Sequence, residues 1–276
     1  MEYTYQRSYR GPVRLVVLDW AGTTIDYGCY APAVAFIEVY RRKGVEIGMQ
    51  QARRPMGLHK HEHIKAISQQ SEVASKWQQV HGRPVTEQDL ADMFADFQPL
   101  QMQYLADYAD LIPGTLDAVA ALRAQGICIG TTTGYFTEAM ELLKAEAARR
   151  GYSPDSSVCA TQVRAGRPEP WMVLQNMVNL GIYPPQAVVK VDDTRPGIEE
   201  GLNAGTWTIG LAKTGNEVGL SLKEISATSP GKLEAMLIKA RGELAHMGAH
   251  YVVDSIADVP WAVEDINRRL ARAEKP

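Results

Sequence analysis

Residues 14–24 read RLVVLDWAGTT and join a strand signal to a loop signal. The apolar run from Leu15 to Leu18 is typical of a short strand that is buried on both faces of a sheet. Asp19 follows directly, and small residues form the turn after it. Because ligands of open parallel sheets bind at the carboxyl ends of the strands, the carboxylate of Asp19 is a candidate for chemistry. An aspartate in this place can also do no more than cap the next turn.

Strand and helix patterns alternate beyond about residue 112. Strands are expected within residues 127–134, 157–160, 187–193, 207–211 and 251–253. The helices expected between and after them include 137–150, 169–180, 196–204, 230–246 and 260–272. This order predicts an α/β fold with a doubly wound parallel sheet.

Residues 28–108 show no good strand pattern. Helices are expected there at about 31–43, 49–54, 58–70, 71–81 and 86–108. We therefore predict two domains: an α/β core of residues 1–27 and 108–276, and an inserted all-helical domain of residues 28–107 over the carboxyl edge of the sheet. The longest of these helices carries an apolar stripe, which serves either packing within the domain or a dimer interface: Met93, Phe94, Phe97, Leu100 and Leu105.

The composition excludes several classes of protein. A net charge of −3 without a basic block argues against a nucleic-acid partner, and no segment is long and apolar enough to suggest a membrane span. The cysteines Cys29, Cys128 and Cys159 form no disulfide or metal-knuckle pattern, and the last two are expected in the core. The first residues lack an apolar leader, so a reduced, cytoplasmic location is expected.

Functional side chains follow several of the expected strands. Asp19 ends the first strand and Thr133 the second, Arg167 lies in a later loop, and the pair Asp192 and Asp193 ends another strand. Carboxylates provide the hard oxygen ligands that Mg²⁺ prefers. Arginine and threonine bind phosphoryl oxygens, and a carboxylate can attack phosphorus. Together these residue types suit phosphoryl transfer on a small-molecule substrate.

The order of these residues resembles the four motifs of the haloacid dehalogenase superfamily over essentially the whole chain. The matching segments are DxxGT at 19–23, Thr133-Gly134, RPxP at 167–170 and Asp192-Asp193. The resemblance implies a haloacid dehalogenase-like core with a helical cap, an aspartyl-phosphate on Asp19, and Mg²⁺ held by Asp19 and an acid of the fourth motif. Arg167 stands where lysine is commoner and keeps the charge.

Ala21 departs from the pattern of the superfamily's phosphatases. They usually carry a second aspartate there, which protonates the departing alkoxide as a general acid. Alanine cannot do this, and a carbon leaving group would need an electron sink. Lys60 offers one, because a neutral lysine amine condenses with a carbonyl to give an iminium. Burial or neighbouring cations lower a lysine pKa, although most lysines are simply solvated.

The segments DWAGT at 19–23 and MGxxKxxH at 56–63 closely resemble the phosphonoacetaldehyde hydrolase, or phosphonatase, family. The resemblance implies a Schiff base at Lys60, attack by Asp19 on phosphorus, and release of acetaldehyde and phosphate in the degradation of an aminophosphonate. It also implies that the carbonyl of Ala21 is a metal ligand and that the cap forms a homodimer. The substrate-binding or supporting residues that it implies are Cys29, Met56, Gly57, His63, Thr133, Gly134, Tyr135 and Arg167.

The acids of the fourth motif leave questions open. Alignment by Asp-Thr favours Asp193 as the direct metal ligand, which leaves Asp192 to a metal-bound water. Many superfamily members have a further acid four residues on, but Gly197 stands there. Glu199 and Glu200 are expected to be solvated helix residues.

The histidines near Lys60 allow two interpretations. His59 and His63 are spaced i,i+4 and could form half of a zinc site, but no third ligand is apparent nearby. We expect instead that His63 orients or relays protons around Lys60, and that His59 and His61 help to lower the lysine pKa.

Two other functions compete with a phosphonatase. One is a phosphatase of the same superfamily that acts on small phosphate esters, which would need an acid near Ala21. The other is a catalytically dead core used as a binding protein, although the nucleophile, cation and metal acids are all present.

Overall fold

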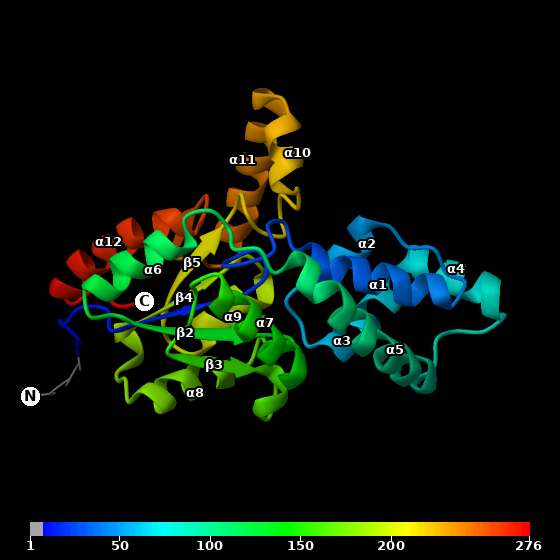
Figure 1. Ribbon diagram of the computed structural model, residues 1–276, viewed down its shortest axis with the longest axis horizontal. Coiled ribbons are helices and arrows are strands. Elements are labelled where there is room, and N and C mark those ends of the chain that lie inside the picture. The colour runs from blue at the N-terminus through cyan, green and yellow to red at the C-terminus, as the bar shows by residue number, and fades with distance from the viewer. Residues whose placement is uncertain (1–7) are drawn as a thin grey trace, which may run out of the picture.

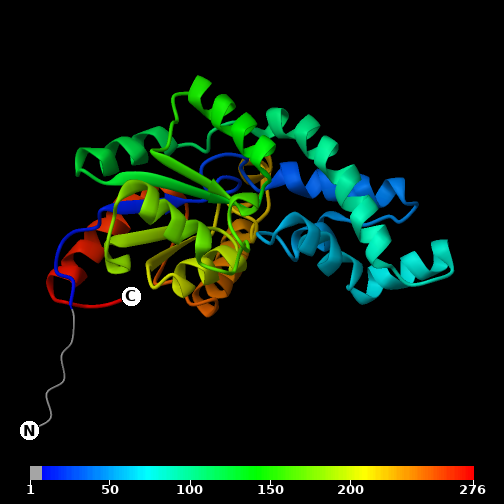
Figure 2. The same ribbon diagram turned by 90° about the horizontal axis from the view of Figure 1, so that it is seen from below.

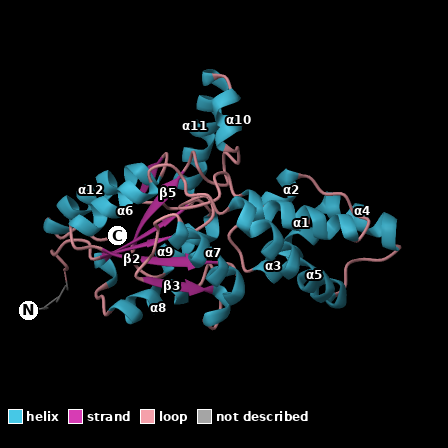
Figure 3. Ribbon diagram, in the orientation of Figure 1, coloured by secondary structure: helices cyan, strands magenta, loops and turns pink. Residues whose placement is uncertain are grey.

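The computed structural model describes residues 8–276 and is centred on a parallel sheet of six strands (Figures 1 and 3). The strands lie in the order β3-β2-β1-β4-β5-β6. Their bounds are β1 Leu15–Leu18, β2 Cys128–Thr133, β3 Ser156–Cys159, β4 Val188–Asp192, β5 Trp207–Leu211 and β6 Tyr251–Val253. The order reverses between β1 and β4, which is where open α/β sheets bind ligands. The predicted fold class is confirmed.

The residues of β1 point alternately to two layers of helices. Val16 and Leu18 pack in the apolar core that includes α6, α7 and α12, whereas Leu15 and Val17 pack on the other face beside α8. All four side chains are fully buried, which explains why the strand reads as an unbroken apolar run. The helices of the two layers are α6 Thr115–Ala124, α7 Thr137–Arg149 and α12 Val259–Ala271 on one face, and α8 Trp171–Leu180, α9 Arg195–Asn203 and α11 Pro230–His246 on the other.

Helices α1 to α5 form a separate group at one end of the sheet, which we call the helical unit (Figures 1 and 2). Their bounds are α1 Tyr30–Arg42, α2 Met49–Arg53, α3 Lys60–Ser68, α4 Ser71–His81 and α5 Glu87–Leu105. The unit has its own apolar core, in which Met93, Phe97 and Leu100 of α5 are buried. Packing inside the unit therefore accounts for most of the stripe on α5. The division into domains at residues 28 and 107 stays a prediction.

Most of the expected elements lie within two residues of the observed ones. The longest helix ends at Leu105, and a 3-10 turn, Ala106–Tyr108, follows it. The short helix α10, Leu222–Ala227, was not expected; with the first turns of α11 it extends beyond the sheet (Figure 1). Within residues 8–276, no helix combines the length and the hydropathy that a membrane crossing requires.

Candidate active site

Asp19 lies at the end of the central strand β1. Its backbone N–H donates to the carbonyl of Val191 at 3.0 Å, which continues the pairing of β1 with β4. The hydroxyl of Thr24 donates to the carbonyl of Asp19 at 3.0 Å and helps to close the following loop. Gly22, at φ +83°, lets this loop turn back beside Asp193, where any side chain would collide with the carboxylate. The carboxylate of Asp19 is buried, with 5% of the residue exposed.

Arg167 binds the carboxylate of Asp19 directly. Its Nη2 lies 2.6 Å from Oδ1 of Asp19 and 3.3 Å from Oδ2 of Asp192, while its Nε lies 3.0 Å from Oε2 of Glu200. Arg167 also donates to the carbonyl of Thr132 at 3.1 Å. The guanidinium is therefore held on several sides, as a cation that must present a fixed geometry to phosphoryl oxygens requires.

A second buried cation, Lys190 of β4, lies behind Arg167. Its Nζ is 2.8 Å from Oδ2 of Asp192, 3.5 Å from Oε2 of Glu200 and 2.7 Å from the hydroxyl of Thr132. The prediction that Glu200 is solvated is wrong, because it is completely buried between the two cations. A lysine inside the apolar run of β4 is the sequence signal that should have pointed to a buried acid partner. Glu199, by contrast, pairs with Arg195 near the surface.

Three carboxylates, from Asp19, Asp192 and Asp193, converge beside this network. One oxygen of each lies within 4.8 Å of the others, and all three residues are buried. Burial raises the pKa of Asp193 well above its usual value, and the charges of Asp192 and Asp19 raise it further. Burial also raises the pKa of Asp19, against the effect of Arg167. Crowded oxygen ligands of this kind fit a hard divalent cation, which would relieve their repulsion.

The two acids of the fourth motif have different surroundings. Oδ1 of Asp192 accepts bonds from the backbone N–H groups of Asp193 and Thr194 and from the Thr194 hydroxyl, at 2.8–3.0 Å. Burial favours the neutral acid, but Arg167 and Lys190 outweigh it and hold the pKa of Asp192 below its usual value. No lysine or arginine pairs with Asp193 within residues 8–276. Asp193 is thus the freer of the two to bind a metal.

Cys29 joins the metal acids to the helical unit. Its backbone at φ +55° immediately precedes α1, and its Sγ donates to Oδ2 of Asp193 at 3.2 Å. Burial raises the pKa of the Cys29 thiol well above its usual value, and Asp193 adds to the effect. Cys29 is therefore a neutral donor at the boundary of the two units. Cys159 is buried as expected, whereas Cys128 is only half-buried.

Lys60, the first residue of α3, brings an amine from the helical unit to the same place. Lys60 and Asp19 line one small cavity of about 20 Å³, with Ala21, Cys29, Met56, Gly57, Thr133, Gly134, Tyr135 and Arg167 among its other walls. The Nζ of Lys60 lies 4.9 Å from the ring centroid of Tyr135 and 5.7 Å from that of Phe36. Segments far apart in the sequence thus meet at one point.

Burial is the main reason that Lys60 has an unusual pKa. It lowers the pKa to about 8, and Arg167 contributes in the same direction, whereas Asp19 opposes the change. The histidines that the sequence suggested, His59 and His61, are not the main cause. About a tenth of the amine is therefore neutral at pH 7, the form that nucleophilic chemistry requires.

Close contacts between the two units surround this cavity. Gly57 has φ +94°, and a Cβ there would lie 2.4 Å from Oγ1 of Thr194 in the core. A Cβ on Gly134 would lie 3.0 Å from the carbonyl oxygen of Leu58. The backbone N–H of Tyr135 donates to the hydroxyl of Thr133 at 3.2 Å. The small residues allow the loop before α3 to lie close to the loops that follow β2 and β4.

A profile described as a haloacid dehalogenase-like hydrolase matches residues 13–205. The chain is a member of this family. It is 47% identical, over 99% of each chain, to a protein of Syntrophobacter fumaroxidans named phosphonoacetaldehyde hydrolase-like protein. It is 45% identical to a phosphonoacetaldehyde hydrolase of Nitratidesulfovibrio vulgaris, over 98% of this chain and 96% of that one. A crystal structure of a phosphonoacetaldehyde hydrolase-like protein from Oleispira antarctica is 42% identical and covers both chains fully, with a TM-score of 0.97.

Two predicted site residues, His63 and the metal ligand Asp193, do not line the cavity of this hydrolase, and His63 does not belong to the metal cluster either. Its Nε2 lies 2.8 Å from the carbonyl oxygen of Ala52, and its ring stacks on Phe36 at 3.8 Å between centroids. Burial lowers its pKa well below the usual value, and Lys60 lowers it further. Its neutral ring therefore supports Phe36, which in turn lies beside Lys60. Half of a zinc site is not supported, because the carboxylate trio is the metal-ligating cluster found in residues 8–276.

Proposed function

We propose that this protein hydrolyses phosphonoacetaldehyde to acetaldehyde and phosphate. The observation that carries the proposal is the buried amine of Lys60 lining one cavity with the carboxylate of Asp19. The absence of an acid at Ala21 supports it, because a carbon leaving group needs an electron sink rather than a general acid. The near full-length similarity to proteins named phosphonoacetaldehyde hydrolase supports the same substrate.

Lys60 acts first in the proposed sequence. Its neutral amine attacks the aldehyde carbonyl, water leaves, and an iminium forms. The carboxylate of Asp19 then attacks phosphorus, and the electrons of the breaking C–P bond move into the iminium to give an enamine. Protonation at carbon and hydrolysis release acetaldehyde and regenerate Lys60. Water cleaves the aspartyl-phosphate to phosphate and free Asp19.

The remaining charged residues stabilise phosphorus during these steps. Arg167 is held where it can bind phosphoryl oxygens while it orients Asp19. Thr133 and Gly134 line the same cavity and would contact the phosphonate. Asp19, Asp193 and the carbonyl of Ala21 would hold Mg²⁺, which haloacid dehalogenase-like hydrolases generally use. When bound, Mg²⁺ would offset the negative charge that otherwise repels the phosphonate from Asp19.

The size of the cavity implies movement between the two units. About 20 Å³ holds little more than one water molecule and cannot admit the substrate. We infer that the helical unit acts as a cap that opens for substrate and closes to bring Lys60 to Asp19. The segments between β1 and α1, and between α5 and α6, are the expected hinges.

Borohydride trapping tests the proposal. The protein is mixed with phosphonoacetaldehyde, reduced, digested and searched by mass spectrometry, with Lys65 of the same helix as the internal reference. We expect a stable adduct on Lys60 and none on Lys65. Phosphate release without an adduct would identify an ordinary phosphatase. If neither an adduct nor phosphate is found, the binding-protein alternative is favoured. A homodimer and a cytoplasmic location stay predictions.

A further inference from the structure

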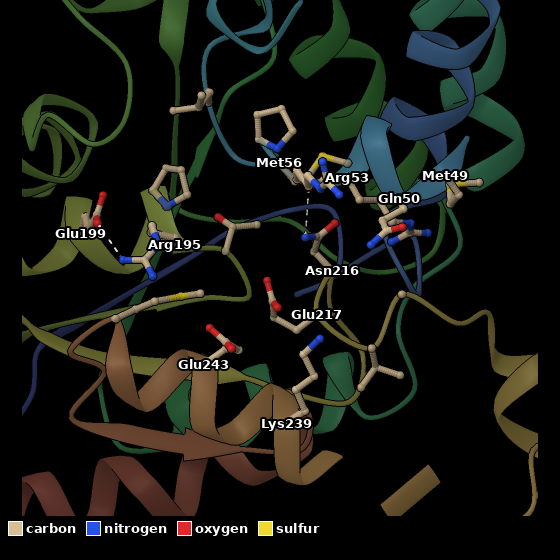
Figure 4. A pocket seen from close by; sticks show the side chains of 18 of the residues that line it. Met49, Gln50, Arg53, Met56, Arg195, Glu199, Asn216, Glu217, Lys239 and Glu243 are labelled. Atoms are coloured by element: carbon tan, nitrogen blue, oxygen red, sulfur yellow. Dashed lines mark hydrogen bonds and ion pairs between the residues drawn. The ribbon is translucent and has the colours of Figure 1, made fainter. Parts of the chain in front are cut away.

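A second, larger cavity lies between the helical unit and the core (Figure 4). Its volume is about 720 Å³, enough for a whole small substrate, and we call it the outer cavity. Met56 and Thr194 line both the outer cavity and the small cavity at Lys60. A molecule in the outer cavity is therefore separated from the reacting groups by little more than these two residues.

Arg53, the last residue of α2, lines the outer cavity from the side of the helical unit. Only 8% of the residue is exposed, and its guanidinium lies 4.9 Å from the ring centroid of Tyr30. None of its three guanidinium nitrogens has a hydrogen-bond acceptor within residues 8–276. Buried donors that stay unpaired are costly, so the protein holds this cation ready at some expense in stability.

Asn216 connects Arg53 to the metal acids. Its Nδ2 donates to the carbonyl of Arg53 at 3.4 Å, and its backbone N–H donates to Oδ2 of Asp193 at 2.7 Å. The Oδ1 of Asn216 is also buried without a partner among the described residues. Arg53 thus lies one residue away from the group that binds the metal in the proposed mechanism.

The charges around the outer cavity are unevenly distributed. Glu217 and Glu243 lie on the wall opposite Arg53 (Figure 4), with Lys239 beside them. Burial raises the pKa of Glu217, and Glu243 raises it further, so this wall already carries crowded negative charge. Arg195 on the core side is paired with Glu199 at 3.5 Å. Among the described residues, Arg53 and Lys239 are thus the cations of this cavity without an ion pair, and Arg53 is the buried one.

We infer that Arg53 forms an outer oxyanion site that receives the phosphonate group of the substrate before the cap closes. A planar guanidinium with free donors matches a phosphonate or phosphate dianion, which can accept two parallel bonds. The inference rests on the proposed function, since it names the path by which that substrate reaches Lys60 and Asp19. Product phosphate has the same chemistry and would compete for the same site.

Arg53→Met and the matched control Arg54→Met test this site. Arg54 lines the same cavity but is half-exposed and already paired with Glu72 at 2.9 Å. In Arg53→Met, we expect KM for phosphonoacetaldehyde and the inhibition constant of inorganic phosphate to rise together, by about tenfold to a hundredfold, while kcat changes little. Arg54→Met should change both constants by less than about twofold. Arg53→Lys keeps the charge but lacks the two parallel N–H donors of the guanidinium, so its effect on both constants should be intermediate.

Two results would overturn the site. If kcat falls in Arg53→Met while KM and the inhibition constant of phosphate stay unchanged, Arg53 serves as a contact between the units. If Arg53→Met and Arg54→Met have equal effects, Arg53 contributes only a general electrostatic attraction of anions to the cavity. Thermal unfolding with and without inorganic phosphate, in metal-free buffer, gives a readout that needs no turnover: the increase in Tm should shrink in Arg53→Met only. If the unaltered protein fails to cleave phosphonoacetaldehyde, the proposed function fails, and this Tm comparison still decides about Arg53. If Arg53→Met does not fold, Arg53→Lys carries the test.

Discussion

The charged groups on the two sides of the reaction cavity differ in whether they have ion-pair partners. On the core side, Asp19, Asp192 and Glu200 are each within ion-pair distance of Arg167. On the side of the helical unit, Lys60 lies against aromatic rings and has no ion pair within residues 8–276. The comparison shows how one fold keeps some buried groups charged by pairing them and makes another partly neutral by burying it alone.

Removing the amine of Lys60 should abolish the contribution of the helical unit to the reaction. Lys60→Arg keeps the positive charge but cannot form an imine, so we expect hydrolysis of phosphonoacetaldehyde to fall by at least about 10⁴-fold. Lys65→Arg, at a half-buried position on the same helix, should retain activity. Phosphate release assays measure both variants. Substantial activity in Lys60→Arg would show that the amine is not the electron sink.

Removing the carboxylate of Asp19 should abolish phosphoryl transfer, while Lys60 of the helical unit still forms the imine. In Asp19→Ala we expect no measurable phosphate release, a loss of about 10⁴-fold or more, because the carboxylate that attacks phosphorus is gone. Borohydride should still trap the substrate on Lys60. If the adduct disappears as well, Asp19 also organises substrate binding and the two sides are not separable.

The buried ion-pair network should respond to loss of a single partner. Glu200→Gln leaves Arg167 and Lys190 under-compensated, and we expect a decrease of roughly 3–5 kcal/mol in the free energy of unfolding. Glu199→Gln changes the neighbouring, solvent-accessible position and should cost less than about 1 kcal/mol. Urea unfolding measures the difference. Equal costs would mean that Glu200 contributes no more than a surface charge.

The contact between the two sides can be tested at glycine. Gly57 and Gly82 both have positive φ, but a Cβ on Gly57 would lie 2.4 Å from Thr194, whereas one on Gly82 meets nothing within 4 Å. Gly57→Ala should therefore raise the activation free energy for C–P cleavage by about 1–3 kcal/mol, because the cap closes less completely. Gly82→Ala carries the same backbone strain and should leave cleavage unchanged. Steady-state kinetics of the two variants distinguish closure from strain.

Imine formation should also depend on pH. Since burial lowers the pKa of Lys60 to about 8, the neutral amine should increase about tenfold per pH unit below that value and level off above it. Pre-steady-state trapping with borohydride between pH 6 and 9.5 measures this fraction. A rate that is still rising about tenfold per pH unit at pH 9.5 would show a lysine with an ordinary pKa.

Much of the fold and part of the site were predictable from local patterns. The apolar run Leu15–Leu18 located β1 because a strand buried on both faces has few polar positions. Ala21 and Lys60 together indicated the chemistry, since a missing acid and an available amine are visible one residue at a time. The direction of His63 and the burial of Glu200 were not predictable, because both depend on what packs against a helix face rather than on the helix itself.

The sequence by itself determined the succession of strands and helices along the chain, the residue types at the strand ends and the presence of an amine in the helical insertion. Tertiary structure decided which charges meet. Arg167 reaches Asp19 across 148 positions of the chain, and Glu200 finds both cations only after α9 packs on β4. The lowered pKa of Lys60 likewise follows from its burial against Phe36 and Tyr135. The ion-pair partners of a buried group and its desolvation depend on the folded interior, so they cannot be read from a local stretch of sequence.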